Sequence, residues 1–169
     1  MDNKNLDPYG RPYPDPSKLV PRTAADALVI RKSKSSDSEF EILLITRKKP
    51  GPSQGKHAFP GGHIDYNEDP QVAVVRELEE ECGIKGTNPV LFTVRGAPDR
   101  DDRYHMISII YHVELEDENS QPVAQDDAAS ANWYDIRQVL SQPDIFAFDH
   151  YSILKELVDT NEKYKSLRT

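Results

Sequence analysis

The sequence predicts one α/β domain in which helices pack on both sides of a central mixed β-sheet. Segments rich in β-branched and aromatic residues alternate along the chain with amphipathic helical patterns. With 169 residues, the chain is long enough to bury about two-thirds of its unfolded surface in one packed domain. The sequence contains no internal repeat and no linker that would separate a second domain.

An extended N-terminal arm is expected over residues 1–22, ahead of a single domain over residues 23–165. Five of the thirteen prolines fall in the arm, with Tyr9 and Tyr13 between them. Proline fixes φ and removes a backbone donor, which favours extended backbone. The arm is either a poorly ordered terminus or a segment that packs on the domain or on a partner subunit.

The first half of the domain predicts two strands followed by a helix. Residues 25–32 (ADALVIRK) and 40–48 (FEILLITRK) predict a hairpin around a polar loop. A turn-rich connector then leads into HAFPGGHI. Asp69 and Pro70 predict the N-cap and first position of a helix that runs to about Cys82 and ends at Gly83.

The second half predicts further strands and two more helices. Residues 89–96 and 104–116 read as strands, and residues 131–136 as a short one. A short helix is expected over residues 135–142. Asp149 is expected to cap a final amphipathic helix. The buried stripe of that helix is Ile153, Leu154, Leu157 and Val158.

Composition limits the function classes. A net charge of −8 argues against broad nucleic-acid binding, and an anionic substrate must be met by local cations or by a metal ion. No stretch reads as a secretory signal or is apolar enough to span a bilayer, so no membrane partner is expected. The single Cys82 cannot form an internal disulfide, which indicates a reducing compartment and a cytoplasmic protein.

Four glutamates crowd into five positions of the first predicted helix. With the geometry of an α-helix, Glu77, Glu80 and Glu81 share an arc of about 100°, whereas Glu79 points away. Arg76 lies one turn before Glu80 and can orient it. Repulsion between the three carboxylates favours Mg²⁺ or Mn²⁺ as a counter-ion, because both prefer oxygen ligands. The alternative interpretation is that this run of glutamates is only a solvated acidic face of the helix. A separate apolar stripe comprises Val74, Val75, Leu78 and Cys82.

The spacing of Gly62, Glu68 and the run from Arg76 to Ile84 resembles the Nudix box at each of its specified positions, over residues 62–84. The resemblance implies an α/β/α sandwich that hydrolyses a nucleoside diphosphate linked to another moiety. The implied metal ligands are the Gly61 carbonyl and the carboxylates of Glu77, Glu80 and Glu81. It also implies that Glu68 is an outer ligand or a support for the loop, and that Arg76 positions the glutamates. Asp65 and Asn67 replace a frequent Glu and Gly, and Asn tolerates left-handed backbone.

Pro98 and the loop PDRDDRYH resemble the ADP-ribose pyrophosphatase group of this family, although Asp102 and Tyr104 replace its usual Pro and Gly. Arg100 and Arg103 can make the bidentate phosphate contacts that a net-acidic protein must supply locally. The alternative interpretation is that the loop is a surface turn whose arginines have no role in binding. The expected substrate-binding residues are Arg47, Pro98, Arg100, Arg103 and His105.

Two later segments, QDDAASANWYDI and FAFDHYSIL, resemble the same group. In the first, Asp127 is expected to act with Glu80, Glu81 and Arg76 in catalysis, one of the acids taking a proton from water. The alternative interpretation is that Asp126 and Asp127 only form a turn or cap a neighbouring segment.

The expected reaction is metal-dependent hydrolysis of ADP-ribose to AMP and ribose 5-phosphate. Three alternatives stay open. In the first, the enzyme acts on another nucleotide: a dinucleotide polyphosphate, an oxidised nucleoside triphosphate or another nucleoside diphosphate sugar. In the second, the protein is a non-catalytic ADP-ribose sensor. In the third, its acidic face binds another protein. Relatives of this group are often homodimers, so a homodimer is kept among the expectations.

Overall fold

The computed structural model describes residues 20–34, 39–126 and 128–168. The arm expected over residues 1–22 therefore lies almost wholly outside the described residues. The packed chain continues past residue 165, because Leu167 is buried. No helix in the described part of the chain is long and apolar enough to cross a membrane.

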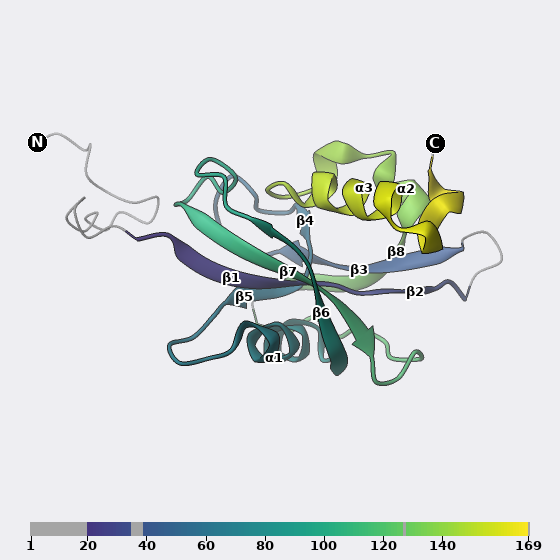
Figure 1. Cartoon of the computed structure of the whole chain (residues 1–169), viewed down its shortest axis with the longest axis horizontal. Coiled ribbons are helices and arrows are strands. Elements are labelled where there is room, and N and C mark those ends of the chain that lie inside the picture. Colours follow the sequence, from purple (N-terminus) through teal and green to yellow (C-terminus); the bar gives the residue numbers. More distant parts are fainter. Residues whose placement is uncertain (1–19, 35–38, 127, 169) are drawn as a thin grey trace, which may run out of the picture.

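Two four-stranded sheets form the centre of the described structure (Figure 1). The first is mixed and has the order β5 (Gly61–His63), β1 (Arg22–Leu28), β7 (Met106–Leu115), β6 (Gly86–Arg95). In it, β1 runs parallel to β7, and the other pairs are antiparallel. In the second sheet, β3 (Phe40–Arg47) pairs antiparallel with β2 (Ile30–Lys32), β4 (His57–Ala58) and β8 (Ala128–Asp135).

The strand predicted over residues 25–32 is divided between the two sheets. Its first part, β1, pairs with β7 and β5 rather than with the next strand in sequence. The last three residues, β2, form the expected hairpin with β3. Sequence patterns do not reveal this division, because the apolar run from Ala27 to Ile30 crosses it without a break and both faces of β1 are buried. The two-residue β4 and three-residue β5 are also too short to show a period.

Helices cover both faces of the sheets, as expected (Figure 1). Helix α1 (Pro70–Cys82) packs on one face. On the other lie α2 (Ile136–Leu140), α3 (His150–Thr160) and 3₁₀ helices at Pro143–Ile145 and Glu162–Leu167. Alternate residues of β1 serve the two cores: Ala25 and Ala27 face α1, whereas Leu28 faces α3.

The ends of α1 follow the prediction. Asp69 is the N-cap, and its side chain accepts a hydrogen bond from the Gln71 amide at 2.8 Å. Pro70 is the first helical residue, and Gly83 ends the helix with φ 63°. The apolar stripe is buried on the sheet through Val74, Leu78 and Cys82, with Val75 partly buried. The acidic arc of α1 lies on another side of the helix, where Glu80 is exposed and Glu81 is buried against Gly61.

The start of α3 departs from the prediction. Asp149 occupies the N-cap position, but its side chain makes no capping hydrogen bond. Its carboxylate is instead paired with the guanidinium of Arg100. The predicted stripe is correct, because Ile153, Leu154, Leu157 and Val158 are all buried.

Candidate active site

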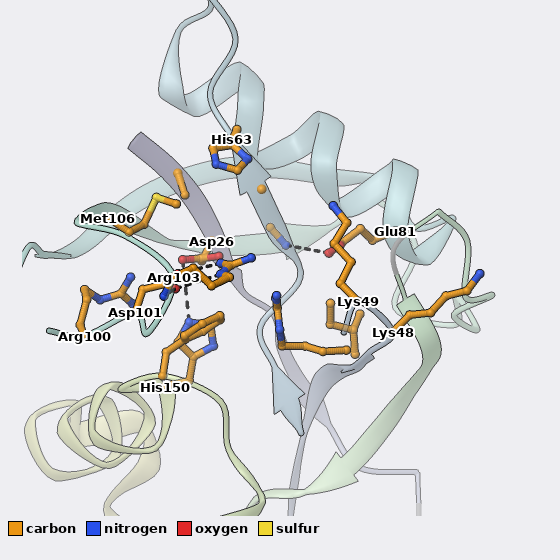
Figure 2. A pocket seen from close by; sticks show the side chains of 16 residues that line it. Asp26, Lys48, Lys49, His63, Glu81, Arg100, Asp101, Arg103, Met106 and His150 are labelled. Atoms are coloured by element: carbon orange, nitrogen blue, oxygen red, sulfur yellow. Dashed lines mark hydrogen bonds and ion pairs between the residues drawn. The ribbon is translucent and has the colours of Figure 1, made fainter. Parts of the chain in front are cut away.

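One pocket lies between the N-terminal part of β1, the β5–α1 region, the loop before β7 and the start of α3. In Figure 2, Asp26, Arg100, Asp101, Arg103 and His150 gather on one side, and Glu81 lies on the other with Lys48 and Lys49. Five cations line it: Arg47, Lys48, Lys49, Arg100 and Arg103. Three acids line it: Asp26, Glu81 and Asp101. The pocket is therefore locally cationic although the chain carries a net charge of −8.

Glu81 is the α1 glutamate that lines this pocket, and Arg76 binds two other glutamates of the helix, Glu77 and Glu80. Its guanidinium donates to Glu77 at 2.8 Å and to Glu80 at 2.9 Å, so the expected contact with Glu80 is present. It also donates to both oxygens of Glu68 at 2.7 and 2.8 Å. These bonds bring the pKa of Glu68 down to about 2. Glu68 in turn accepts from the Asp65 amide at 2.9 Å, and it supports the loop in which Asn67 has φ 64°.

Two glycines let the loop approach α1 closely. The Gly61 amide donates to Glu81 Oε2 at 2.9 Å, and Glu81 is only 5% exposed. A Cβ atom at Gly61 would lie 2.4 Å from the Ala25 carbonyl oxygen, and one at Gly62 would lie 2.5 Å from the Glu77 carboxylate. Any larger residue at either position would displace the loop or the acidic face.

The expected metal ligands are neighbours but are not gathered into one cluster. Among residues 20–34, 39–126 and 128–168, no three acidic, histidine or cysteine side chains stand together as a metal site. The reason is that Arg76 binds Glu77 and Glu80, while Glu81 is turned toward Gly61. Burial raises the pKa of Glu77, and the nearby charges of Glu80 and Asp126 raise it further. Carboxylate oxygens are the donor type that a hard divalent cation prefers, but in this arrangement Arg76 and the Gly61 amide occupy them.

Three of the five expected substrate-binding residues, Arg47, Arg100 and Arg103, line the pocket. Arg100 pairs with Asp149 at 2.5 Å. Arg103 pairs with the buried Asp101 at 2.7 Å. Burial tends to raise the pKa of Asp101, but the hydrogen bonds from Arg103 outweigh it and the net shift is downward.

The other two expected substrate-binding residues do not line the pocket. Pro98 is exposed on the loop. His105 Nε2 lies 3.0 Å from the Gly96 carbonyl oxygen and so ties the two ends of that loop together. Asp127, expected to act in catalysis, lies outside the described residues, whereas its neighbour Asp126 is close enough to influence Glu77.

Sequence reasoning missed two buried polar residues of the pocket, Asp26 and His150. Asp26 lies in β1 and accepts a hydrogen bond from Ser108, and burial raises its pKa to about 6. His150 Nδ1 accepts from the Phe59 amide at 3.0 Å, so the ring hydrogen is on Nε2, 3.9 Å from Asp26 Oδ2. Burial lowers the pKa of His150 to about 3, which keeps it neutral. For Asp26 the sequence did hold a signal, because a single acid within an apolar strand is expected to be buried and is therefore a candidate functional residue.

The chain is similar to proteins of known family. A family model described as NUDIX domain matches residues 20–157. The ADP-ribose pyrophosphatase of Methanocaldococcus jannaschii is 36% identical over 138 residues, which is 82% of this chain and 73% of that protein.

Two solved structures resemble the fold. The NUDIX domain of Shewanella oneidensis NrtR complexed with ADP ribose has a TM-score of 0.72 and 22% identity, over 86% of this chain and 92% of that one. A Francisella tularensis bifunctional NMN adenylyltransferase/ADP ribose pyrophosphatase, complexed with AMP and a manganese ion, has a TM-score of 0.65 and 28% identity. That match covers 83% of this chain and 42% of the other.

Proposed function

Since the chain belongs to the NUDIX domain family, we propose that it is a metal-dependent pyrophosphohydrolase that converts ADP-ribose and water to AMP and ribose 5-phosphate. The observation that carries this proposal is one pocket that three arginines line on one side and that Glu81 of α1, with Gly61 and Gly62, lines on the other. An acidic face and a cationic wall are what a metal-bound pyrophosphate needs on its two sides. The relative that spans 82% of this chain is an ADP-ribose pyrophosphatase, which supports this substrate.

The carboxylates of Glu77, Glu80 and Glu81 and the carbonyl of Gly61 would hold the metal, for which we propose Mg²⁺, with Mn²⁺ as the substitute. When bound, such an ion polarises the scissile phosphorus–oxygen bond and lowers the pKa of the attacking water. The protein's part is to keep the donors close. The glycines at 61 and 62 leave space for the loop, and Arg76 orients the glutamates.

Two further roles, phosphate binding and proton uptake, fall to side chains of the protein. Arg47, Arg100 and Arg103 bind the phosphate oxygens and offset the charge that develops on the leaving phosphate. We assign proton uptake from the attacking water to Glu80, because its side chain is 49% exposed whereas that of Glu77 is 13% exposed and Glu81 is buried. The phosphorus–oxygen bond of the pyrophosphate breaks, and the leaving phosphate becomes part of one of the two products.

The experiment that tests this function is product analysis on a panel of substrates. The purified protein is incubated with MgCl₂ and ADP-ribose, a diadenosine polyphosphate or 8-oxo-dGTP, and products are separated by ion-exchange chromatography. We expect AMP and ribose 5-phosphate from ADP-ribose at the highest kcat/KM, with no turnover in EDTA. Preferential hydrolysis of another member of the panel would reject ADP-ribose as the substrate while leaving the reaction class intact.

We also propose a homodimer and a cytoplasmic location. The dimer is supported by three exposed apolar residues of β6, an edge strand of the first sheet: Val90, Leu91 and Val94. Sedimentation equilibrium of the full chain tests it, and a monomer at micromolar concentration would contradict it. The cytoplasmic location is supported by the one thiol, Cys82, which is buried and free.

A further inference from the structure

Phe148 has a backbone conformation that its residue type disfavours. Four non-glycine residues in the described ranges have positive φ, and three of them are Asn or Asp: Asn67, Asn88 and Asp126. Those residue types tolerate the left-handed region, whereas a bulky aromatic residue there is strained. Phe148, with φ 55°, is the fourth. Strain of this kind persists only where the surroundings enforce it.

The neighbours of Phe148 fix it from both sides. The Ala147 amide donates to the His57 carbonyl at 2.8 Å, which anchors the preceding residue to β4. The following residue, Asp149, is held by Arg100. The Phe148 ring, thus placed, is half-buried and lines the active-site pocket.

Three guanidinium groups surround this ring. The guanidinium carbon lies 4.7 Å from the ring centroid for Arg47, 5.3 Å for Arg103 and 6.0 Å for Arg100. These arginines come from β3 and from the loop before β7, and all three contact the Phe148 ring. The electron-rich face of an aromatic ring attracts each cation and offsets part of their mutual repulsion. That repulsion is real here: burial lowers the pKa of Arg47, and the charge of Arg103 lowers it further.

Arg47 differs from the other two arginines in what it bonds. Arg100 and Arg103 direct hydrogen bonds to Asp149 and Asp101. The Nε atom of Arg47 is buried and has no hydrogen-bond partner within the described residues. A buried donor without an acceptor is costly, and a phosphate group bound at the same guanidinium would offset that cost through charge-assisted hydrogen bonds.

We propose that Phe148 is a positioning residue that holds Arg47, together with Arg100 and Arg103, as the binding site for a pyrophosphate group. The role of this group as part of ADP-ribose rests on the proposed function, but the anion site itself does not. The strained backbone brings the ring against the arginines, and an anion bound at the Arg47 guanidinium would compensate a cation whose buried Nε has no hydrogen-bond partner within the described residues.

Inorganic pyrophosphate, in metal-free buffer at low ionic strength, is the probe that tests this site by titration calorimetry. Phe148→Tyr keeps an aromatic face and should bind within twofold of the wild type. Phe148→Leu keeps an apolar side chain but lacks the ring, and should bind about tenfold more weakly. Leucine binding as tightly as the wild type, or no binding by the wild type itself, would overturn the proposal.

A second pair of variants separates binding from folding. Phe148→Ala and Phe148→Gly both remove the ring, but glycine accepts the positive φ without strain. We expect the glycine variant to have the higher Tm of the two and both to bind pyrophosphate weakly. Wild-type affinity in the glycine variant would show that the ring is dispensable. Turnover of ADP-ribose by the wild type is measured separately, so that a failed substrate assignment is not mistaken for a failed anion site.

Discussion

Arg100 and Asp149 form an ion pair that joins the loop before β7 to the start of α3. The Arg100 Nη2 atom lies 2.5 Å from Asp149 Oδ1, and Nε lies 3.1 Å from each carboxylate oxygen. The Arg100 side chain is only 3% exposed, so Asp149 compensates a buried positive charge. The pair explains why Asp149 does not cap α3, because its carboxylate is committed elsewhere.

Asp149→Ala is expected to destabilise the fold far more than the loss of a helix cap would. A lost cap costs about 1 kcal/mol. An unpaired buried guanidinium costs about 3–5 kcal/mol. Urea unfolding of the wild type, Asp149→Ala, Arg100→Met and the double variant measures the coupling. The double variant should be more stable than Asp149→Ala alone, and additive effects of the two changes would contradict the ion pair.

Arg76→Ala is expected to lower the Tm of the metal-free protein by a few degrees, because Glu77 and Glu80 lose their shared counter-ion. Mg²⁺ should restore more of the Tm in the variant than it adds to the wild type, since it would neutralise the same carboxylates. Scanning calorimetry with EDTA and with MgCl₂ makes the comparison. Equal effects of Mg²⁺ on both proteins would argue against a metal at these glutamates.

His150 should contribute to acid lability. Its pKa is about 3 in the fold and near the ordinary 6.5 when unfolded, so stability is complete above 6.5 and falls as the unfolded state takes up a proton below it. Between pH 6.5 and 5 the loss from this group is about 2 kcal/mol. Asp26 works in the opposite sense, because its raised pKa of about 6 makes the fold bind a proton first.

His150→Asn isolates this contribution, since asparagine keeps an acceptor for the Phe59 amide but does not titrate. Urea unfolding at pH 6.5 and pH 5 should show about 2 kcal/mol less loss in the variant than in the wild type. Parallel losses in the two proteins would mean that His150 is not the group responsible.

Local signals carried much of the prediction. The caps of α1, its separation into acidic and apolar faces, and the contact of Arg76 with Glu80 all follow from spacing within one helix. The family prediction rested on 23 contiguous residues and is confirmed by the domain match over residues 20–157. The position of Asn67 at positive φ was likewise readable from its residue type.

Long-range contacts were not predictable in the same way. Asp26 and Ser108 meet because β1 pairs in parallel with β7, a pairing that no hairpin signal announces. Asp149 was predicted to be a helix cap, because nothing in the local sequence indicates that the fold places Arg100 beside it. The sequence analysis assigned no role to Phe148, because neither its φ nor the arginines around its ring can be predicted from neighbouring positions.

The most direct test of the central claim compares Glu80→Gln with Glu79→Gln in Mg²⁺-dependent hydrolysis of ADP-ribose. Both residues are exposed glutamates of α1, but Glu79 lies off the acidic arc and controls for charge and helix stability. We predict that Glu80→Gln lowers kcat by about 100-fold or more, whereas Glu79→Gln stays near the wild type. Equal activity of the two variants would contradict a catalytic role for the acidic arc of α1.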